Sequence, residues 1–177
     1  MKKEIIIING TGESGKDTFV EFCSKYEKIY NFSSIDKVKE VATIIGWNGK
    51  KTEKDRKFLS DLKRLTTEYN DMAFKSIVDA VEKFNQDDNK IMFIHIREPY
   101  EIKRASEAFN AKTLLIKRKG HKNITSNDSD AFVDNYDYDY TIENDTLEQL
   151  EESAKKFVDI VLKKNEYKPK RRKLTLN

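Results

Sequence analysis

Residues 4–19 read EIIIINGTGESGKDTF, and this stretch decides the fold of the chain. Its four consecutive isoleucines are typical of a strand buried on both faces, as in the middle of a parallel sheet. The turn that follows leads into a helical pattern from Lys16. Glycines in the turn, namely Gly10, Gly12 and Gly15, permit positive φ angles and close backbone approach, so that N–H groups can point at a phosphate. The stretch therefore predicts a phosphate-binding loop at a helix N-terminus.

The spacing of this loop is GxxxxGK, in which Lys16 is the residue that reaches the phosphates of a nucleotide. The usual Ser or Thr ligand of Mg²⁺ after the lysine is replaced by Asp17, whose carboxylate can hold the ion directly or through water. Thr18 is expected to donate to a phosphate, with an ordinary first-turn hydroxyl as the alternative. We therefore expect ATP and Mg²⁺ as cofactors, with Asp17 as the metal ligand. The expected nucleotide-binding residues are Gly10, Gly12, Glu13, Ser14, Gly15, Lys16, Asp17 and Thr18.

Length and composition favour a single cytoplasmic domain. The chain has 177 residues, of which 37% are charged, and it has no long apolar run that would indicate a signal peptide or a membrane span. Its one cysteine, Cys23, shares a helical face with Phe19, Phe22 and Tyr26. We therefore expect a core side chain at this position and not a reactive thiol.

The positive net charge belongs to the C-terminus. Residues 163–177 contain seven Lys or Arg and one Glu, so this segment carries a formal charge of +6 and the rest of the chain −3. Because the basic cluster KPKRRK has no interleaved aromatic residues, nucleic acid is not expected as a partner. We divide the chain into a domain at 1–164 and a basic tail at 165–177 that is expected to lack regular structure.

Strand and helix patterns alternate along the chain. Further strands are expected at 28–32, 90–96, 112–116 and 140–143, and helices at 16–26, 35–45, 99–109 and 147–162. This alternation predicts an α/β fold with a central parallel sheet of about five strands, helices on both faces, and ligands outside the carboxyl ends of the strands. Ser33 and Ser34 are candidate N-caps for the second helix.

A long helical pattern at 53–86 is compatible with one helix or two. Its apolar residues are spaced for either a homodimer seam or simple packing on the chain's own sheet. Residues 118–135 are polar and long for a connector, and their position after a strand predicts a lid over the substrate. The sequence leaves the oligomeric state open.

Phosphoryl transfer requires cations that neutralise the transferred group while donor and acceptor are held in line. Lys16, Arg97 and Arg118 are expected to be catalytic. Arg97 follows the third strand, with an ion pair to Glu98 or Glu101 as its alternative. The expected acceptor-binding residues are Lys37, Arg97 and Lys117. Lower-ranked cations are Lys39, Lys63, Arg64 and Lys119.

Four stretches, in order along the chain, resemble the deoxynucleoside monophosphate kinases of phages and bacteria and the similar animal-type phosphomevalonate kinases. They are SGKDT at 14–18, SIDKVKEVA at 34–42, HIREPYE at 95–101 and DYTIENDTLEQLE at 139–151. The resemblance implies a three-layer P-loop kinase fold and transfer of the γ-phosphoryl group of ATP, with Mg²⁺, to a small phosphorylated acceptor. A nucleoside or deoxynucleoside monophosphate is the leading candidate, and a phosphomevalonate-type acceptor or a nucleotide-binding protein without catalysis are the alternatives.

The sequence departs from this family at two positions. Where the family has an acidic residue that helps to organise Mg²⁺ at the end of the third strand, this chain has His95, a poor partner for that ion. The acidic segment of the lid is represented only by residues 128–130, Asp-Ser-Asp.

Overall fold

The computed structural model describes residues 2–120, 133–163 and 174–176. The chain divides into two compact units. The first, which we call the sheet unit, comprises Met1–Asn31 and Asp87–Asn177, and the second, the helical unit, comprises Phe32–Gln86.

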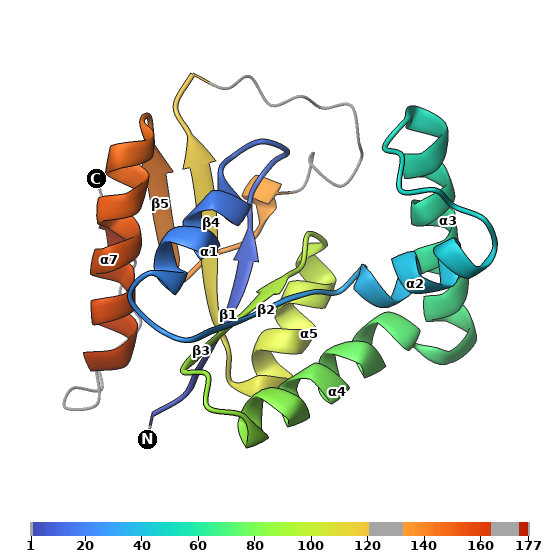
Figure 1. The fold of residues 1–177 in the computed structure, drawn as a ribbon, viewed down its shortest axis with the longest axis horizontal. Helices are drawn as coiled ribbons and strands as arrows, with labels where there is room; N and C mark the ends of the chain where they lie inside the picture. The colour runs from blue at the N-terminus through green and yellow to red at the C-terminus, as the bar shows by residue number, and fades with distance from the viewer. Residues whose placement is uncertain (1, 121–132, 164–173, 177) are drawn as a thin grey trace. The chain divides into compact units, whose positions relative to one another are not determined.

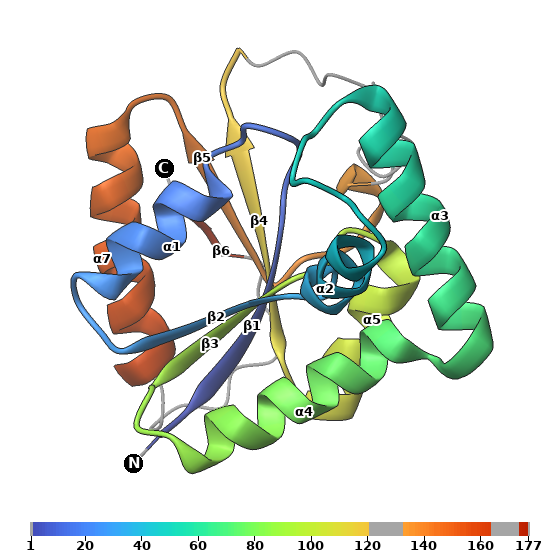
Figure 2. The ribbon, with the colours of Figure 1, turned by 45° about the vertical axis from the view of Figure 1, so that its right-hand side comes forward.

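The sheet is built from strands β1 to β6 in the order β2-β3-β1-β4-β5-β6. Strand β1 pairs in parallel with β3 and β4, and β5 pairs in parallel with β4 and β6. Figure 2 shows β1 between β3 and β4. The strands are Glu4–Asn9, Ile29–Ser33, Ile91–His95, Lys112–Arg118, Tyr140–Asn144 and Leu174–Leu176.

Helices cover both faces of this sheet (Figure 1). Helices α1 (Lys16–Ser24) and α7 (Leu147–Lys163) pack against one another on one face, and α5 (Pro99–Phe109) contacts β1 and β4. The α1/α7 side contains an aromatic core in which the Phe19 ring lies edge-on to those of Phe93 and Phe157, at centroid distances of 6.2 and 5.7 Å. Burial of these rings stabilises the layer that carries the start of α1.

The predicted fold class is confirmed as a parallel α/β sheet with helices on both faces. Three of the four isoleucines of β1, namely Ile6, Ile7 and Ile8, are fully buried because the strand is central, as their unbroken apolar run predicts. Cys23 is fully buried, and burial raises the pKa of its thiol. It is therefore a core residue, as expected.

The C-terminus differs from the expectation at one place. Residues 174–176 form β6 on the open edge of β5, although they fall in the tail that was expected to lack regular structure. An unpaired strand edge offers backbone hydrogen bonds to any extended segment that reaches it, whatever charged residues precede it. The remainder of that tail, residues 165–173 and 177, lies outside the described part of the chain.

The helical unit contains α2 (Asp36–Ile44), α3 (Glu53–Asn70) and α4 (Met72–Gln86), which contact one another. The long pattern at 53–86 is thus two helices, separated at Asp71, which adopts φ 59°. Helix α3 begins with a capping box, in which Thr52 accepts from Asp55 N and the Asp55 carboxylate accepts from Thr52 N.

The predicted serine cap of α2 is wrong. The N-cap residue is Ile35, which has no side-chain oxygen to offer. The carboxylate of Asp36, the first residue of α2, instead accepts from Ser33 N at 3.0 Å. The side chain that accepts the hydrogen bond across this turn therefore belongs to the helix and not to a serine. On α3, Leu65 and Tyr69 of the apolar stripe are exposed, and homodimerisation stays a prediction.

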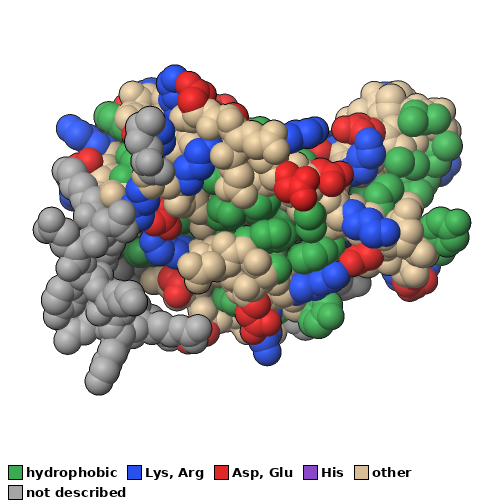
Figure 3. All heavy atoms as spheres, turned by 90° about the horizontal axis from the view of Figure 1, so that it is seen from below, with side chains coloured by type: hydrophobic (Ala, Val, Ile, Leu, Met, Phe, Trp, Pro, Cys, Tyr) green, Lys and Arg blue, Asp and Glu red, His purple; other side chains and the backbone are tan. Residues whose placement is uncertain are grey.

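Two surface properties bear on possible partners. Over the described residues, none of the helices combines the length and apolar character needed to cross a membrane. On the face drawn in Figure 3, the described part of the surface intersperses basic and acidic side chains.

Candidate functional site

The parallel strands bring several predicted residues to one edge of the sheet. The strands are parallel, so the carboxyl ends of β1, β3, β4 and β5 lie at the same edge; β1 and β3 end within one residue of each other, and β4 continues three residues past Leu115, the partner of Asn9. The glycine-rich loop, residues 10–15, leaves the sheet at this edge and enters α1. The carboxyl edge of the sheet unit is therefore the place where the loop, the end of β3 and the end of β4 meet.

Two glycines are required by the shape of the loop. At Gly10 a Cβ atom would lie 2.5 Å from the carbonyl oxygen of Ile116, so only glycine lets the loop approach β4 this closely. Gly15 adopts φ 93° and is the N-cap of α1. As a glycine, the N-cap residue has no side chain that could cap α1. Its first-turn N–H groups thus form the positive end of a helix, the kind of site that binds phosphate.

Gly12, which lies between these two glycines, does not have the positive φ that the sequence pattern suggests. The neighbouring Glu13 takes that conformation, with φ 60°. A left-handed conformation is unfavourable for a residue with a Cβ, which indicates that the surrounding loop imposes it. The turn needs one left-handed residue here, but the sequence pattern places it one position too early.

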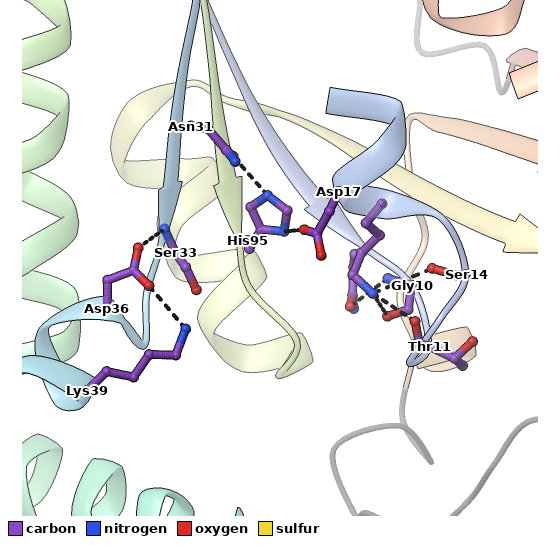
Figure 4. A network of polar contacts seen from close by, with 11 residues as sticks. Gly10, Thr11, Ser14, Asp17, Asn31, Ser33, Asp36, Lys39 and His95 are labelled. Carbon is purple, nitrogen blue, oxygen red and sulfur yellow. Dashed lines mark hydrogen bonds and ion pairs between the residues drawn. The ribbon is translucent and has the colours of Figure 1, made fainter. Parts of the chain in front are cut away.

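Lys16 lies against the loop that precedes it. Its Nζ donates to the carbonyl oxygens of Gly10 and Thr11, at 2.5 and 2.8 Å, and lies 3.5 Å from Ser14 Oγ (Figure 4). The ammonium group is therefore positioned within the loop by local contacts, beside the N-terminus of α1. Two sources of positive charge converge at this point.

Asn9 holds the entrance of the loop and was not predicted from the sequence. Its side chain is fully buried, accepts from Gly10 N at 2.8 Å, and donates to Tyr138 Oη at 2.7 Å and to the carbonyl oxygen of Arg97 at 3.1 Å. Tyr138 Oη donates in turn to Val133 O at 3.0 Å. Burial raises the pKa of Tyr138 to about 12, so its hydroxyl remains a donor at neutral pH.

Asn144 holds the other side of the loop. Its Nδ2 donates to Ser14 O at 3.2 Å and to Lys117 O at 2.8 Å, while its backbone oxygen accepts from Lys119 N at 2.8 Å. A buried side-chain amide thus ties the loop to the ends of β4 and β5. An asparagine in sequence carries no signal that separates this role from a surface position, so only the fold identifies it.

A pocket of about 340 Å³ opens beside the loop. Its lining combines backbone and polar groups with two leucines. The residues are Glu13, Ser14, Gly15, Lys16, Asp17, Thr18, Arg118, Asn144, Asp145, Thr146, Leu147 and Leu150. Six of the eight nucleotide-binding residues expected from the sequence are among them, with Arg118 as a second cation.

The other predicted cations are not among the residues that line this pocket. Lys117 Nζ lies 2.7 Å from Asp134 Oδ1. Arg97 follows β3, where Asn9 holds its backbone oxygen. Lys37 is exposed on α2 of the helical unit and pairs with Glu40 at 2.6 Å. Most of the predicted lid, residues 121–132, lies outside the described residues.

The protein side chains at this site can supply only some of the ligands of a divalent ion. The Asp17 carboxylate follows Lys16 directly and its side chain is 88% exposed, so it can reach an ion on a bound phosphate. Among the described residues, no group of three or more His, Cys, Asp or Glu side chains could hold an ion by itself. Ligands from the nucleotide would therefore complete the coordination, as is usual for Mg²⁺ at phosphate sites.

No family model and no curated protein matches the chain. Among solved structures, TT1252 from Thermus thermophilus matches with a TM-score of 0.55 and 16% identity over 92% of this chain and 99% of that one. Shikimate kinase from Bacteroides thetaiotaomicron gives 0.46 and 15%, with 90% and 98% covered. Thymidylate kinase from Ehrlichia chaffeensis gives 0.33 and 13%, with 99% and 93% covered. The first comparison supports a shared fold.

Proposed function

We propose that the chain is a P-loop kinase that transfers the γ-phosphoryl group of ATP to a small phosphorylated acceptor, most simply a nucleoside or deoxynucleoside monophosphate. The proposal rests mainly on one observation. The Lys16 ammonium group lies within a glycine-rich loop that follows a central parallel strand and ends at the N-terminus of α1. This combination of cation, loop and helix end suits a polyphosphate and explains why a lysine stands in the turn.

The donor half of the reaction uses groups of the sheet unit. The loop and the first turn of α1 bind the phosphates, and the pocket beside them accommodates the nucleoside between polar groups and leucines. Lys16 and Arg118 neutralise charge on the transferred group. A divalent ion held by Asp17 and the nucleotide would supply further neutralisation of the phosphates.

The acceptor half is supported by the resemblance and by the position of Arg97. This residue follows the end of β3 at the edge where the loop leaves the sheet, and its guanidinium can grip two phosphate oxygens at once. Lys37 and Lys117 are the further candidates for the acceptor phosphate. Lys117 would have to exchange its contact with Asp134 for the phosphate.

An ADP-release assay across the ribo- and deoxyribonucleoside monophosphates, with phosphomevalonate in the same panel, tests this function. Turnover of a nucleoside monophosphate is the expected result. Turnover of phosphomevalonate alone would support the phosphomevalonate-type alternative. ATP binding without turnover of any acceptor would support a nucleotide-binding protein without catalysis, for which the histidine at position 95 is the motivating observation.

A further inference from the structure

His95 occupies a defined position between two side chains at the carboxyl edge of the sheet unit. Its Nε2 lies 2.9 Å from Asn31 Oδ1 on β2, and its Nδ1 lies 3.9 Å from Asp17 Oδ1 in the first turn of α1 (Figure 4). The imidazole is 16% exposed, whereas the Asp17 side chain is 88% exposed. The ring is thus held from one side and points its other nitrogen toward a movable carboxylate.

The contact with Asn31 fixes the orientation of the ring. Because Nε2 lies against Asn31 Oδ1, Nδ1 is the ring nitrogen that faces the Asp17 carboxylate. Histidines that bind metals show the same arrangement, with one nitrogen toward the ion and the other N–H donated to an oxygen that fixes the ring.

The distance between the two side chains also suits a shared ion. Two ligand atoms that each lie about 2.1 Å from one ion can be at most about 4.2 Å apart. The 3.9 Å between Nδ1 and Oδ1 is within that limit, and the exposed Asp17 side chain can shorten it by rotation.

We propose that His95 Nδ1 and the Asp17 carboxylate bind a first-row divalent ion of the Mn²⁺ to Zn²⁺ series in preference to Mg²⁺. The remaining ligands would be phosphate oxygens of the nucleotide, so this inference rests on the proposed function. Imidazole nitrogen is a good ligand for these ions, whereas Mg²⁺ prefers oxygen. His95, which is a poor ligand for Mg²⁺, would therefore favour a different divalent ion at this site.

Mn²⁺ with a non-hydrolysable ATP analogue provides a direct probe. Pulsed electron paramagnetic resonance of the ternary complex should detect a nitrogen nucleus bound to Mn²⁺, and growth on ¹⁵N-histidine should replace the ¹⁴N signal by that of ¹⁵N. The chain has two histidines, so His121→Gln is the matched control. The nitrogen signal should persist in His121→Gln and disappear in His95→Gln, with circular dichroism as the check on folding.

Absence of a histidine nitrogen signal from the wild-type ternary complex would overturn the inference while leaving the proposed function intact. Loss of the signal in His121→Gln alone would do the same. Should calorimetry detect no binding of the ATP analogue in the presence of either ion, the proposed function would fail, and the metal inference with it.

A competition experiment measures the preference itself. We expect His95→Asp, which replaces nitrogen by oxygen, to lower the ratio of Mn²⁺ to Mg²⁺ affinity in the nucleotide complex by about tenfold or more. An unchanged ratio would contradict the assignment, because an imidazolium paired with Asp17 makes no contact with the ion.

Discussion

The sheet unit and the helical unit hold their polar side chains in different ways. Around the glycine-rich loop the contacts join distant parts of the chain, such as Asn9 with Tyr138 and Asn144 with Ser14. On α2 and α3, four ion pairs among the described residues join side chains three or four positions apart on the same helix. These pairs are Lys37–Glu40, Lys39–Asp36, Lys57–Asp61 and Arg64–Glu68.

This difference separates two kinds of side-chain role. A local pair on an exposed helix contributes little to stability and leaves its cation able to exchange partners. A buried amide that joins three segments leaves donors and acceptors unsatisfied when it is removed. The loop should therefore be sensitive to substitution of neutral residues, and the helical unit insensitive even to loss of charge.

The largest effect is expected from Lys16→Ala. Removal of the ammonium group from the loop should lower kcat/KM by about a thousandfold or more, because oriented charge at the transferred phosphate is lost. The thermal midpoint should change little. Lys25→Ala, at the exposed end of α1, is the control and should keep parental kinetics. Parental ADP release by the Lys16 variant would exclude the loop as the donor site.

Asn9→Ala should have the next largest effect, on stability. The substitution leaves buried Gly10 N without its acceptor and removes two further hydrogen bonds, so the free energy of unfolding should fall by about 2–3 kcal/mol. Urea denaturation measures it. Asn70→Ala removes an exposed amide from α3 and should cost less than about 0.5 kcal/mol. Equal losses in the two variants would remove the distinction between the units.

Tyr138→Phe removes one link of the same network. At neutral pH it should cost about 1 kcal/mol, the value of a typical intramolecular hydrogen bond. The pKa of Tyr138 is raised in the folded state from its ordinary value of 10.0 to about 12. The contribution of its neutral hydroxyl is therefore complete below pH 10 and is lost as pH rises from 10 through 12.

Denaturation at several values between pH 8 and pH 11 tests this pH dependence. The stability difference between the wild type and Tyr138→Phe should shrink over the alkaline part of that range. A difference that stays constant would mean that the hydroxyl ionises equally well in the folded and unfolded chains.

The smallest structural effect is expected from Lys37→Gln. Its ion pair with Glu40 is exposed and local, so the denaturation midpoint should not change measurably. If Lys37 binds the acceptor phosphate, KM for the acceptor should nevertheless rise, while ATP affinity stays parental. Lys57→Gln, which breaks a similar pair on α3, should change neither quantity. A rise in KM shared by both variants would point to general electrostatics instead of a binding contact.

The sequence by itself determined the features that depend on contiguous residues. Four isoleucines predict a buried strand, and strand β1, the loop and α1 follow in the expected order. The positions of the other strands and helices agree closely with the predicted ranges, because a period of two or of 3.6 residues is visible within a short window. The local ion pairs of α2 and α3 are likewise implied by spacing alone.

Only the tertiary structure decided which side chains act together at the loop. Asn9 and Tyr138 are 129 residues apart, and Asn144 and Ser14 are 130 apart. They meet because the strand order places β1 beside β4 and β4 beside β5, and no contiguous pattern encodes that order. The same order places Arg118 at the pocket and pairs Lys117 with Asp134, although the two cations are neighbours in sequence. Neighbouring residues of a strand point to opposite faces, so their partners come from the fold.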